Sequence, residues 1–314
     1  MTVNDTLAID THAHVYPARY LDMLEQAGVD PDTTAIARGM NADSSDEDMR
    51  TRLQWMDKAG VEQQVLAVTP QVPADAQTAQ WINDEYARLI DTYPGRFHAY
   101  GALPLPDVEA ALAELPHVFE RGFLGVSLPT VFRDGTTLDD ESFAPIWTQL
   151  NDRHAVVNIH PTGYGVCSPL IADKGLAWVN GAPVEDATAT LHLLKAGIPG
   201  KYPNIRFHIA HLGGDLAFMF QRIEDNYTDW DAFPASPQET LRTFYFDAAN
   251  FYEPALRLAV ESYGDTQILG GSDHPYFQED KYVRAFNYVR QAKLPEEQRN
   301  SILRTNAQRL YQLD

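Results

Sequence analysis

The sequence predicts a (β/α)8 barrel from two observations. Short apolar runs rich in β-branched residues recur eight times along its 314 residues. Between them lie longer segments with apolar residues near i, i+3, i+4 and i+7, the spacing of amphipathic helices. Strands that alternate with helices form parallel sheets, and eight such units can close into a barrel. An open doubly wound sheet is the alternative, although no glycine-rich phosphate turn follows the first predicted strand.

The predicted elements follow one another in the order that this fold requires. The strands span residues 6–12, 63–70, 97–104, 123–130, 155–161, 204–211, 243–249 and 266–273. The helices span residues 46–60, 75–93, 107–122, 140–154, 184–197, 215–227, 253–264 and 279–292. A closing helix over residues 295–313 begins with proline, which is favoured in a first turn because its missing N–H is not needed there.

Two predicted connections are unusually long. Residues 15–48 follow the first strand, and residues 161–182 follow the fifth. Long connections in a compact domain often act as lids or binding loops, and an oligomer contact is the structural alternative. The sequence shows no internal repeat, low-complexity tract or linker, and one barrel can take this length, so residues 1–314 are predicted to form a single domain.

Composition excludes several classes of partner. The chain has 24 Lys and Arg residues against 44 Asp and Glu, and its formal charge of -20 repels nucleic-acid phosphates and anionic lipids. No apolar run approaches the length of a membrane span, and the first residues lack the pattern of a signal peptide. The single cysteine, Cys167, excludes an internal disulfide and is expected to be a buried thiol. We therefore expect a cytoplasmic protein with neither nucleic acid nor membrane as partner.

Titratable side chains stand where the predicted strands end. His12 and His14 lie two residues apart in "AIDTHAHVYP", and alternate residues of a strand project from the same face. Four other predicted strands also end on such groups. Active sites of barrel enzymes form where the carboxyl ends of the strands meet. The residues that this rule brings together are His12, His14, His160, His211, Asp247 and Asp273.

Three imidazoles and a carboxylate are a ligand set suited to a divalent transition metal. The predicted ligands are His12, His14, His160 and Asp273. His211 is either a further ligand or a base beside the metal. Asp247 either orients a catalytic group or makes hydrogen bonds at the barrel mouth.

The other histidines are expected to be structural or exposed. His208 lies three residues before His211, so a regular strand directs it to the opposite face, and we expect a packed structural histidine. His274 adjoins Asp273 and is a candidate to support the site. The remaining four are predicted to lie early in the third strand, on helices or before a strand: His98, His117, His154 and His192.

Several motifs resemble the amidohydrolase superfamily. The HxH pair, the histidine after the fifth strand, "AHLGG" and "GSDHP" carry this resemblance. The segments "RLQWMDKAGVEQQVLAVTP", "RFHAYGALPL", "GFLGVSLPT" and "ILRTNAQRLY" are similar to the branch that contains α-amino-β-carboxymuconate-ε-semialdehyde decarboxylase and γ-resorcylate decarboxylase. The resemblance covers almost the whole chain. It implies that His211 is the catalytic histidine and that the ligands are His12, His14, His160 and Asp273.

The resemblance also implies one divalent metal per chain. Two-metal relatives carry a lysine at the end of the fourth strand, where this chain reads "GVSLPT". Some relatives have glutamate at the position of His12. The histidine here makes this chain more similar to the zinc-bearing semialdehyde decarboxylase than to the relatives that carry manganese. The resemblance therefore implies zinc, with manganese as the alternative. For substrate binding, Arg38 and Arg50 are candidates to hold a carboxylate, with solvated arginines as the alternative. Trp178 is expected either to line the pocket or to pack in the structure.

The activity implied by the resemblance is metal-dependent, nonoxidative decarboxylation of a small aromatic or unsaturated carboxylic acid. His211 would relay a proton, and Asp273 is a second candidate to carry one. A hydrolase or hydratase of the same branch is the alternative, and a metal-binding barrel without catalysis is a third hypothesis. A deaminase is disfavoured, because neither "HPTG" nor "HLGG" supplies the proton-moving glutamate. The relatives also imply a homodimer or higher homo-oligomer.

Overall fold

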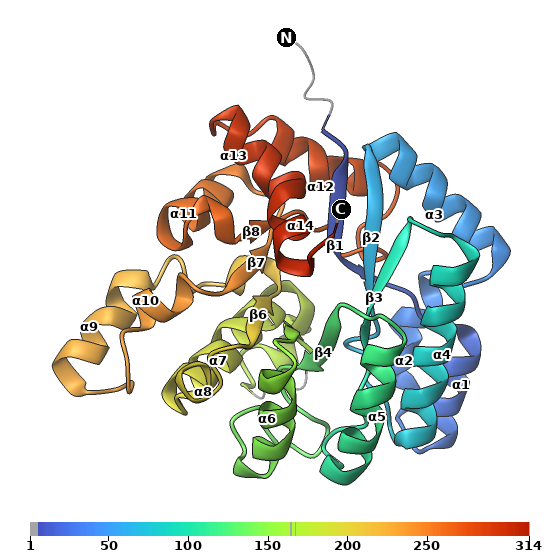
Figure 1. Cartoon of the computed structure of the whole chain (residues 1–314), viewed down its shortest axis with the longest axis horizontal. Helices are drawn as coiled ribbons and strands as arrows, with labels where there is room; N and C mark the ends of the chain where they lie inside the picture. Colours follow the sequence, from blue (N-terminus) through green and yellow to red (C-terminus); the bar gives the residue numbers. More distant parts are fainter. Residues whose placement is uncertain (1–5, 164, 167, 314) are drawn as a thin grey trace.

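The computed structural model describes residues 6–163, 165–166 and 168–313, and it contains one sheet of eight parallel strands. The strands neighbour one another in sequence order from β1 to β8 (Figure 1). Their bounds are β1 (Ala8–His14), β2 (Val61–Ala67), β3 (Phe97–Gly101), β4 (Gly125–Pro129), β5 (Val156–His160), β6 (Arg206–Ile209), β7 (Tyr245–Asp247) and β8 (Ile268–Leu269). All eight predicted strands are confirmed.

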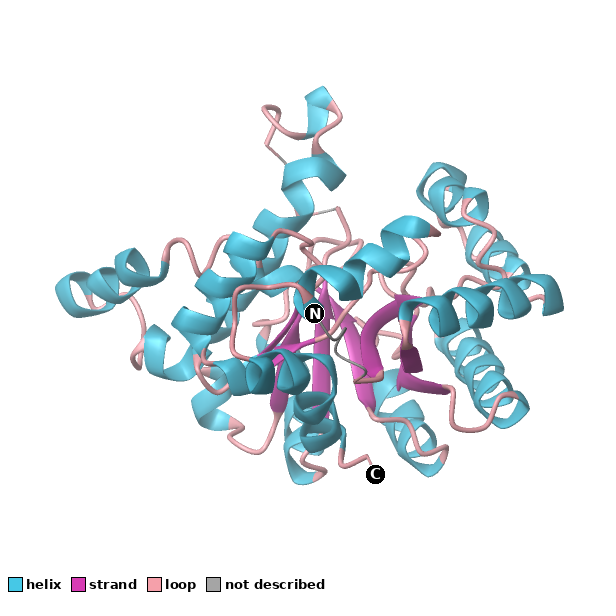
Figure 2. Ribbon diagram, turned by 90° about the horizontal axis from the view of Figure 1, so that it is seen from above, coloured by secondary structure: helices cyan, strands magenta, loops and turns pink. Residues whose placement is uncertain are grey.

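The sheet closes on itself between β8 and β1. Thr11 N donates to Gly270 O at 2.9 Å, and His14 N donates to His274 O at 2.6 Å. Ala13 and His274 form a parallel bridge at the same junction. Seen from above, the strands lie inside a ring of helices (Figure 2). The predicted (β/α)8 barrel is therefore confirmed.

The helices cover the outside of the barrel, while α9 and α10 extend away from it at the left of Figure 1. Their bounds are α1 (Ala18–Gln26), α2 (Pro31–Gly39), α3 (Asp46–Ala59), α4 (Ala76–Thr92), α5 (Val108–Glu120), α6 (Ala144–Asp152), α7 (Ala182–Lys195), α8 (Ile198–Lys201), α9 (Phe220–Trp230), α10 (Pro237–Leu241), α11 (Glu253–Tyr263), α12 (Asp280–Arg290), α13 (Glu296–Asn300) and α14 (Asn306–Tyr311). None of the helices in the described residues is both long and apolar enough to cross a bilayer.

Local sequence signals explain where α3 begins and ends. The Ser45 side chain caps its first turn by accepting a hydrogen bond from Asp48 N, which satisfies a backbone donor that the helix leaves free. The helix stops at Gly60, whose φ of +64° is the left-handed conformation that glycine adopts without steric cost. The β2 strand starts at the next residue. These signals place β2 beside β1, where His14 pairs with Ala67.

Two apolar layers hold the fold together. The larger lies between the helices and the sheet, and a smaller cluster fills the barrel interior with residues such as Ile9, Val65 and Tyr100. The chain end closes this interior, because the Tyr311 hydroxyl lies 2.5 Å from the Tyr100 hydroxyl. The predicted closing helix is observed as α13, a π-helical turn η6 (Ser301–Thr305) and α14.

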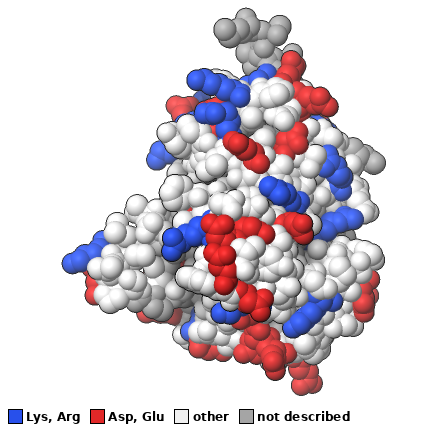
Figure 3. Space-filling view, turned by 90° about the vertical axis from the view of Figure 1, so that its left-hand side faces the viewer, with Lys and Arg blue, Asp and Glu red and all other residues white. Residues whose placement is uncertain are grey.

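The first long connection differs from the lid or binding loop that its length favours, whereas residues of the second line a cavity at the carboxyl end of the barrel. The first folds into α1 and α2, and Tyr20 on α1 donates from its hydroxyl to Gln71 O at 2.7 Å. The second carries short helical turns, including η3 (Ala177–Gly181), and leads to the carboxyl ends of β5 and β6. On the face shown in Figure 3, acidic side chains form a band and basic ones are scattered, in keeping with the net charge.

Candidate metal centre

Four buried side chains converge at the carboxyl end of the barrel. Each offers one donor atom, and these atoms all lie within 4.8 Å of one another. Among the described residues this is the one such group of histidine, cysteine and carboxylate side chains. Its members are the four predicted ligands: His12, His14, His160 and Asp273.

The three histidines reach this point from two strands. His12 and His14 alternate along β1, so both rings project from the same face. His160 ends β5, and its ring centroid lies 5.0 Å from that of His12 and 4.8 Å from that of His14. The backbone at Gly271 passes close to His12. A Cβ on Gly271 would lie only 3.1 Å from the Cβ of His12, so the absence of a side chain on Gly271 leaves room for the histidine.

Hydrogen bonds orient the imidazoles of His14 and His160, and a close contact with a carboxylate orients that of His12, with each Nε2 toward the centre. His14 Nδ1 lies 3.2 Å from Ala67 O, and His160 Nδ1 lies 2.8 Å from Pro161 O. On His12, Nδ1 lies 3.0 Å from Asp247 Oδ2. Partners of this kind fix the ring and its tautomer, so that the opposite nitrogen is free to bind a metal.

Asp273 completes the set from the turn after β8. Its backbone adopts φ +56°, which is uncommon for a residue other than glycine and is held by a hydrogen bond from Asp273 N to His12 O at 2.8 Å. Asp273 Oδ1 lies 3.5 Å from His12 Nε2 and 3.3 Å from His14 Nε2. Burial opposes ionisation, yet the neighbouring imidazoles hold the pKa of Asp273 below its ordinary value, so it is a carboxylate.

The donor set fits a single divalent metal. Four of its buried atoms have no hydrogen-bond partner: His12 Nε2, His14 Nε2, His160 Nε2 and Asp273 Oδ1. Buried polar atoms without partners are unfavourable and uncommon in folded proteins. A cation that accepts three nitrogen donors and one oxygen donor would satisfy all four.

His211 lies beside this cluster but is not a member of it. It follows β6 in the turn η4 (His211–Gly213), where His211 and Leu212 have φ values of +53° and +57°. Its Nε2 lies 3.5 Å from Asp273 Oδ2, and its Nδ1 lies 2.8 Å from Asp186 Oδ2. Although burial works the other way, the hydrogen bond to Asp186 raises the pKa of His211 above the ordinary value.

Asp186 is a site residue that the sequence did not reveal. It lies on α7, is fully buried, and directs one carboxylate oxygen to His211. The turn that carries His211 packs directly on this helix. The approach is so close that a Cβ on Gly214 would overlap the Pro183 carbonyl oxygen. The one signal for Asp186 in the sequence was that an acidic residue lies on the apolar face of the predicted helix over residues 184–197.

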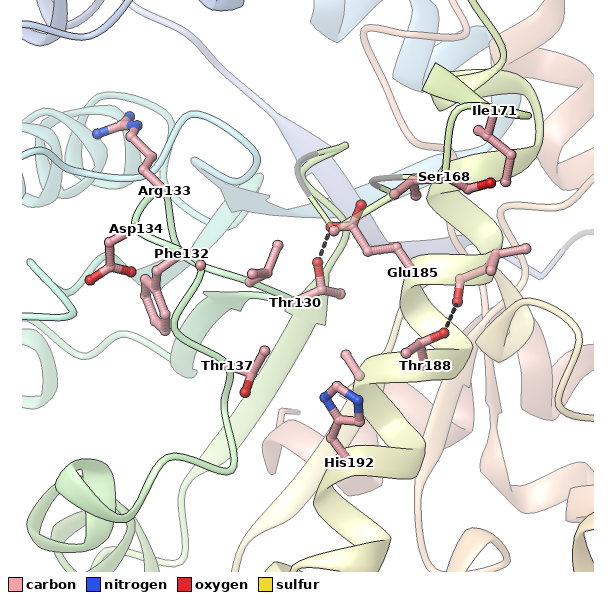
Figure 4. Close-up of a pocket in the computed structure, with 16 residues that line it drawn as sticks. Thr130, Phe132, Arg133, Asp134, Thr137, Ser168, Ile171, Glu185, Thr188 and His192 are labelled. Carbon is pink, nitrogen blue, oxygen red and sulfur yellow. Dashed lines mark hydrogen bonds between the residues drawn. The ribbon is translucent and has the colours of Figure 1, made fainter. Parts of the chain in front are cut away.

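The neighbouring Glu185 points to the other side of α7. Its carboxylate accepts a hydrogen bond from Thr130 Oγ1 (Figure 4). It also accepts hydrogen bonds from Thr162 N at 2.7 Å and from Gly163 N at 2.9 Å. It therefore ties α7 to the end of β4 and to the connection that follows His160. The cavity of about 630 Å³ drawn in Figure 4 lies on this side and contains none of the four predicted ligands.

Asp247 joins several parts of the centre. Its Oδ1 accepts hydrogen bonds from His211 N at 3.2 Å and Ala249 N at 3.1 Å. Its Oδ2 lies 3.0 Å from His12 Nδ1 and 3.1 Å from His208 Nε2. Burial would raise the pKa of Asp247, but His12 and His208 hold it well below the ordinary value. Asp247 thus contacts a predicted ligand and also makes barrel-mouth hydrogen bonds.

The predicted direction of His208 is wrong. Its Nδ1 lies 2.9 Å from the Tyr100 hydroxyl, which belongs to the barrel interior, so the ring points inward. His211 is the residue that departs from strand alternation, because the backbone becomes left-handed there. His208 is fully buried, as expected for a packed structural histidine.

We predict that His208→Ala keeps its metal and lowers the free energy of unfolding by about 2–4 kcal/mol, because it leaves a cavity and removes the buried polar contacts to Tyr100 and Asp247. Metal analysis and urea unfolding would measure the two effects. A folded variant without metal would show that His208 contributes to metal binding.

A cavity of about 400 Å³ opens beside the centre. His160, His211 and Asp273 form part of its wall, and Trp178 lies at its edge with 43% of its surface exposed. Trp178 therefore lines the cavity, as one of its two predicted roles requires. The wall is formed by segments that follow β5, β6, β7 and β8.

The two predicted substrate arginines do not line this cavity. Arg38 lies on α2, where its Nη2 contacts Asp22 at 2.7 Å and Glu25 at 3.0 Å. Arg50 is exposed on α3. The first long connection folds into helices instead of reaching over the centre, which is why the structure gives no support to either arginine as a carboxylate-binding residue.

The other histidines stay outside the cluster. His274 is buried next to Asp273, and its ring packs edge-on against Tyr282. His98 and His192 are partly exposed, and His117 and His154 are exposed. The expected burial of Cys167 falls outside the described residues.

Sequence comparison finds similar proteins of known activity. A sequence model described as amidohydrolase matches residues 9–313. The chain is 29% identical to 2-amino-3-carboxymuconate-6-semialdehyde decarboxylase of Dictyostelium discoideum, over 86% of this chain and 82% of the relative. It is 30% identical to 6-methylsalicylic acid decarboxylase of Penicillium expansum, over 94% of this chain and 93% of the relative.

Structural comparison finds the fold in solved enzymes. A dihydroxybenzoic acid decarboxylase from a Polaromonas species, solved with bound manganese and the inhibitor 2-nitroresorcinol, matches with a TM-score of 0.82 and 26% identity. The match covers 98% of this chain and 97% of that one. A 2,6-dihydroxybenzoate decarboxylase in complex with 2,6-dihydroxybenzoate matches with a TM-score of 0.81 and 25% identity, over 98% and 99% of the chains.

Proposed function

Because this chain belongs to the amidohydrolase family, we propose that it is a metal-dependent decarboxylase of a small aromatic or unsaturated carboxylic acid. The observation that carries the proposal is the donor set of three imidazoles and one carboxylate, which faces a cavity next to His211. Similar chains named as decarboxylases of aromatic and muconate-type acids support it.

We propose zinc as the metal held by this donor set. Three histidine nitrogens with one carboxylate oxygen are a usual zinc environment, and manganese, present in the similar Polaromonas enzyme, is the competitor. When bound, the metal would supply a Lewis acid that binds and orients the oxygen atoms of the substrate.

In the proposed reaction, His211 delivers a proton. The bond between the substrate carbon and its carboxylate breaks, carbon dioxide leaves, and the electron pair stays on the carbon, which then takes up the proton. Asp186 holds His211 Nδ1 at 2.8 Å, so the ring presents Nε2 to the cavity side, next to Asp273. This arrangement matches that of a general acid positioned by a carboxylate. Asp273 is the second candidate to carry the proton.

The proposal predicts metal-dependent release of carbon dioxide. Protein freed of metal should be inactive toward a panel of aromatic and unsaturated acids, and zinc should restore activity until one ion is bound per chain. Metal analysis and carbon dioxide release would be measured on the same samples, with manganese added in parallel. Two ions per chain at full activity would contradict the single-metal site, and uptake of water without carbon dioxide would favour the hydrolase or hydratase alternative.

We also propose that the protein works in the cytoplasm as a homodimer or larger homo-oligomer. A single cysteine fits a reducing compartment. Large apolar side chains are exposed at Leu170, Phe218 and Trp230, which are 80%, 80% and 75% accessible in the single chain. Apolar exposure of this kind is common at protein contacts. Light scattering that finds only a monomer would contradict the assembly.

A further inference from the structure

We infer that the substrate carries one carboxylate on an otherwise uncharged, largely apolar body, and that acids with a second anionic group are rejected. The inference rests on the proposed function and narrows its substrate class. It concerns the part of the cavity that faces away from the predicted ligands and His211. That part would surround the rest of the substrate once its carboxylate is at the centre.

The cavity has one side lined by titratable residues and another lined mostly by apolar ones. One side carries His160, His211 and Asp273. The rest is mostly apolar or aromatic, and among the described residues that line it none is lysine or arginine. The side chains that would surround the substrate body are Trp178, Val179, Asn250, Phe251, Tyr276 and Phe277.

The polar groups in this part of the wall are neutral. They are the Asn250 amide, the Tyr276 hydroxyl and the Trp178 indole. Burial raises the pKa of Tyr276 above its ordinary value, so its hydroxyl stays protonated. Groups of this kind can hydrogen-bond to a hydroxyl substituent, but they do not neutralise a second carboxylate.

Basic groups near the site are already paired with other groups. The one in the lining with a carboxylate partner outside it is His211, whose Nδ1 lies 2.8 Å from Asp186 Oδ2. The Arg284 guanidinium stacks on Phe251, with its Cζ 5.7 Å from the ring centroid, and Arg284 is not part of the lining. Buried Arg52 donates to His14 O and Gln64 Oε1, both at 2.8 Å.

Three histidines around the centre already have carboxylate partners, so they offer little to a second anion. Asp247, Asp186 and Asp273 are all buried within the site. A second carboxylate in this cavity would lose its water without gaining a charged partner, which is strongly unfavourable.

The first test compares two acids that differ at one position. In 4-methylsalicylic acid a methyl group stands where 2-hydroxyterephthalic acid has a carboxylate, on the side of the ring opposite the first carboxylate, and the two are otherwise the same. Calorimetry with the zinc-loaded protein should give at least about 10²-fold tighter binding of the methyl compound, since an unpaired buried charge is penalised more than a lost apolar contact. Equal binding, tighter binding of the dicarboxylate, or no binding of either would overturn the inference.

Carbon dioxide release separates this inference from the proposed function. If the methyl compound binds selectively but is not decarboxylated, and no other monocarboxylate of the panel is, the proposed function fails while the selectivity stands. If dicarboxylates are decarboxylated as efficiently as monocarboxylates, the proposed function stands and the inference fails.

A second test adds the missing cation. Val179 lines the cavity and is 72% exposed, so Val179→Arg can be introduced with little effect on packing. It should reduce the preference for the monocarboxylate by at least about tenfold, through a new ion pair with the second carboxylate. Leu258→Arg, on the exposed surface of α11, adds the same charge away from the lining and should leave the preference unchanged. An unchanged preference in folded Val179→Arg would contradict the inference.

Discussion

His211→Asn is expected to lower turnover by about 10²–10⁴-fold, the usual contribution of a positioned acid or base, while the protein keeps its metal. The reason is geometric. His211 lies outside the group of four donor atoms, with its Nε2 3.5 Å from Asp273 Oδ2 and its Nδ1 held by Asp186. Asparagine removes the ring that carries the proton without removing any of the four donors.

The measurement compares turnover at equal metal occupancy, with folding checked by circular dichroism. Asp186→Asn is the graded comparison, because it weakens the orientation of His211 and should lower kcat by about 10–10²-fold with little change in KM or metal content. Asp91→Asn, an exposed change of the same type on α4, is the matched control. If His211→Asn loses metal as readily as ligand variants do, His211 is a ligand and the proton must come from Asp273 or Asp247.

His12→Ala and Asp273→Ala are expected to lose metal and activity together. Each removes one of four converging donors, and the remaining three buried atoms cannot complete the coordination. Metal content after dialysis and carbon dioxide release would be measured for both variants, with His208→Ala as the buried histidine that is no ligand. A folded His12→Ala protein with full metal content and activity would contradict the ligand set.

The fold and the cluster could be predicted because both depend on short-range patterns. Apolar runs with β-branched residues identify strands, and helical spacing identifies what lies between them. Parallel strands all end at one face, so His160 and Asp273 could be placed beside His12 and His14 although they are far apart in sequence. No local detail of packing was needed for either step.

Features that depend on tertiary contacts or on local backbone geometry were not predicted. Asp186 is an ordinary helix residue until η4 packs against α7 and brings His211 to it. The direction of His208 was predicted wrongly because the left-handed turn at His211 breaks the alternation that the argument assumed. Arg38 was considered for the substrate because the first long connection was expected to form a binding loop, whereas it folds into α1 and α2.

The most direct test of the central claim is to trace solvent atoms into the product. The zinc-loaded protein would turn over its best carboxylic acid in deuterium oxide and, separately, in water labelled with oxygen-18. Decarboxylation predicts one carbon dioxide released per product molecule, one deuterium on the carbon that lost the carboxylate, and no oxygen-18 in the organic product. An organic product that contains solvent oxygen and keeps its carboxylate would contradict a decarboxylase.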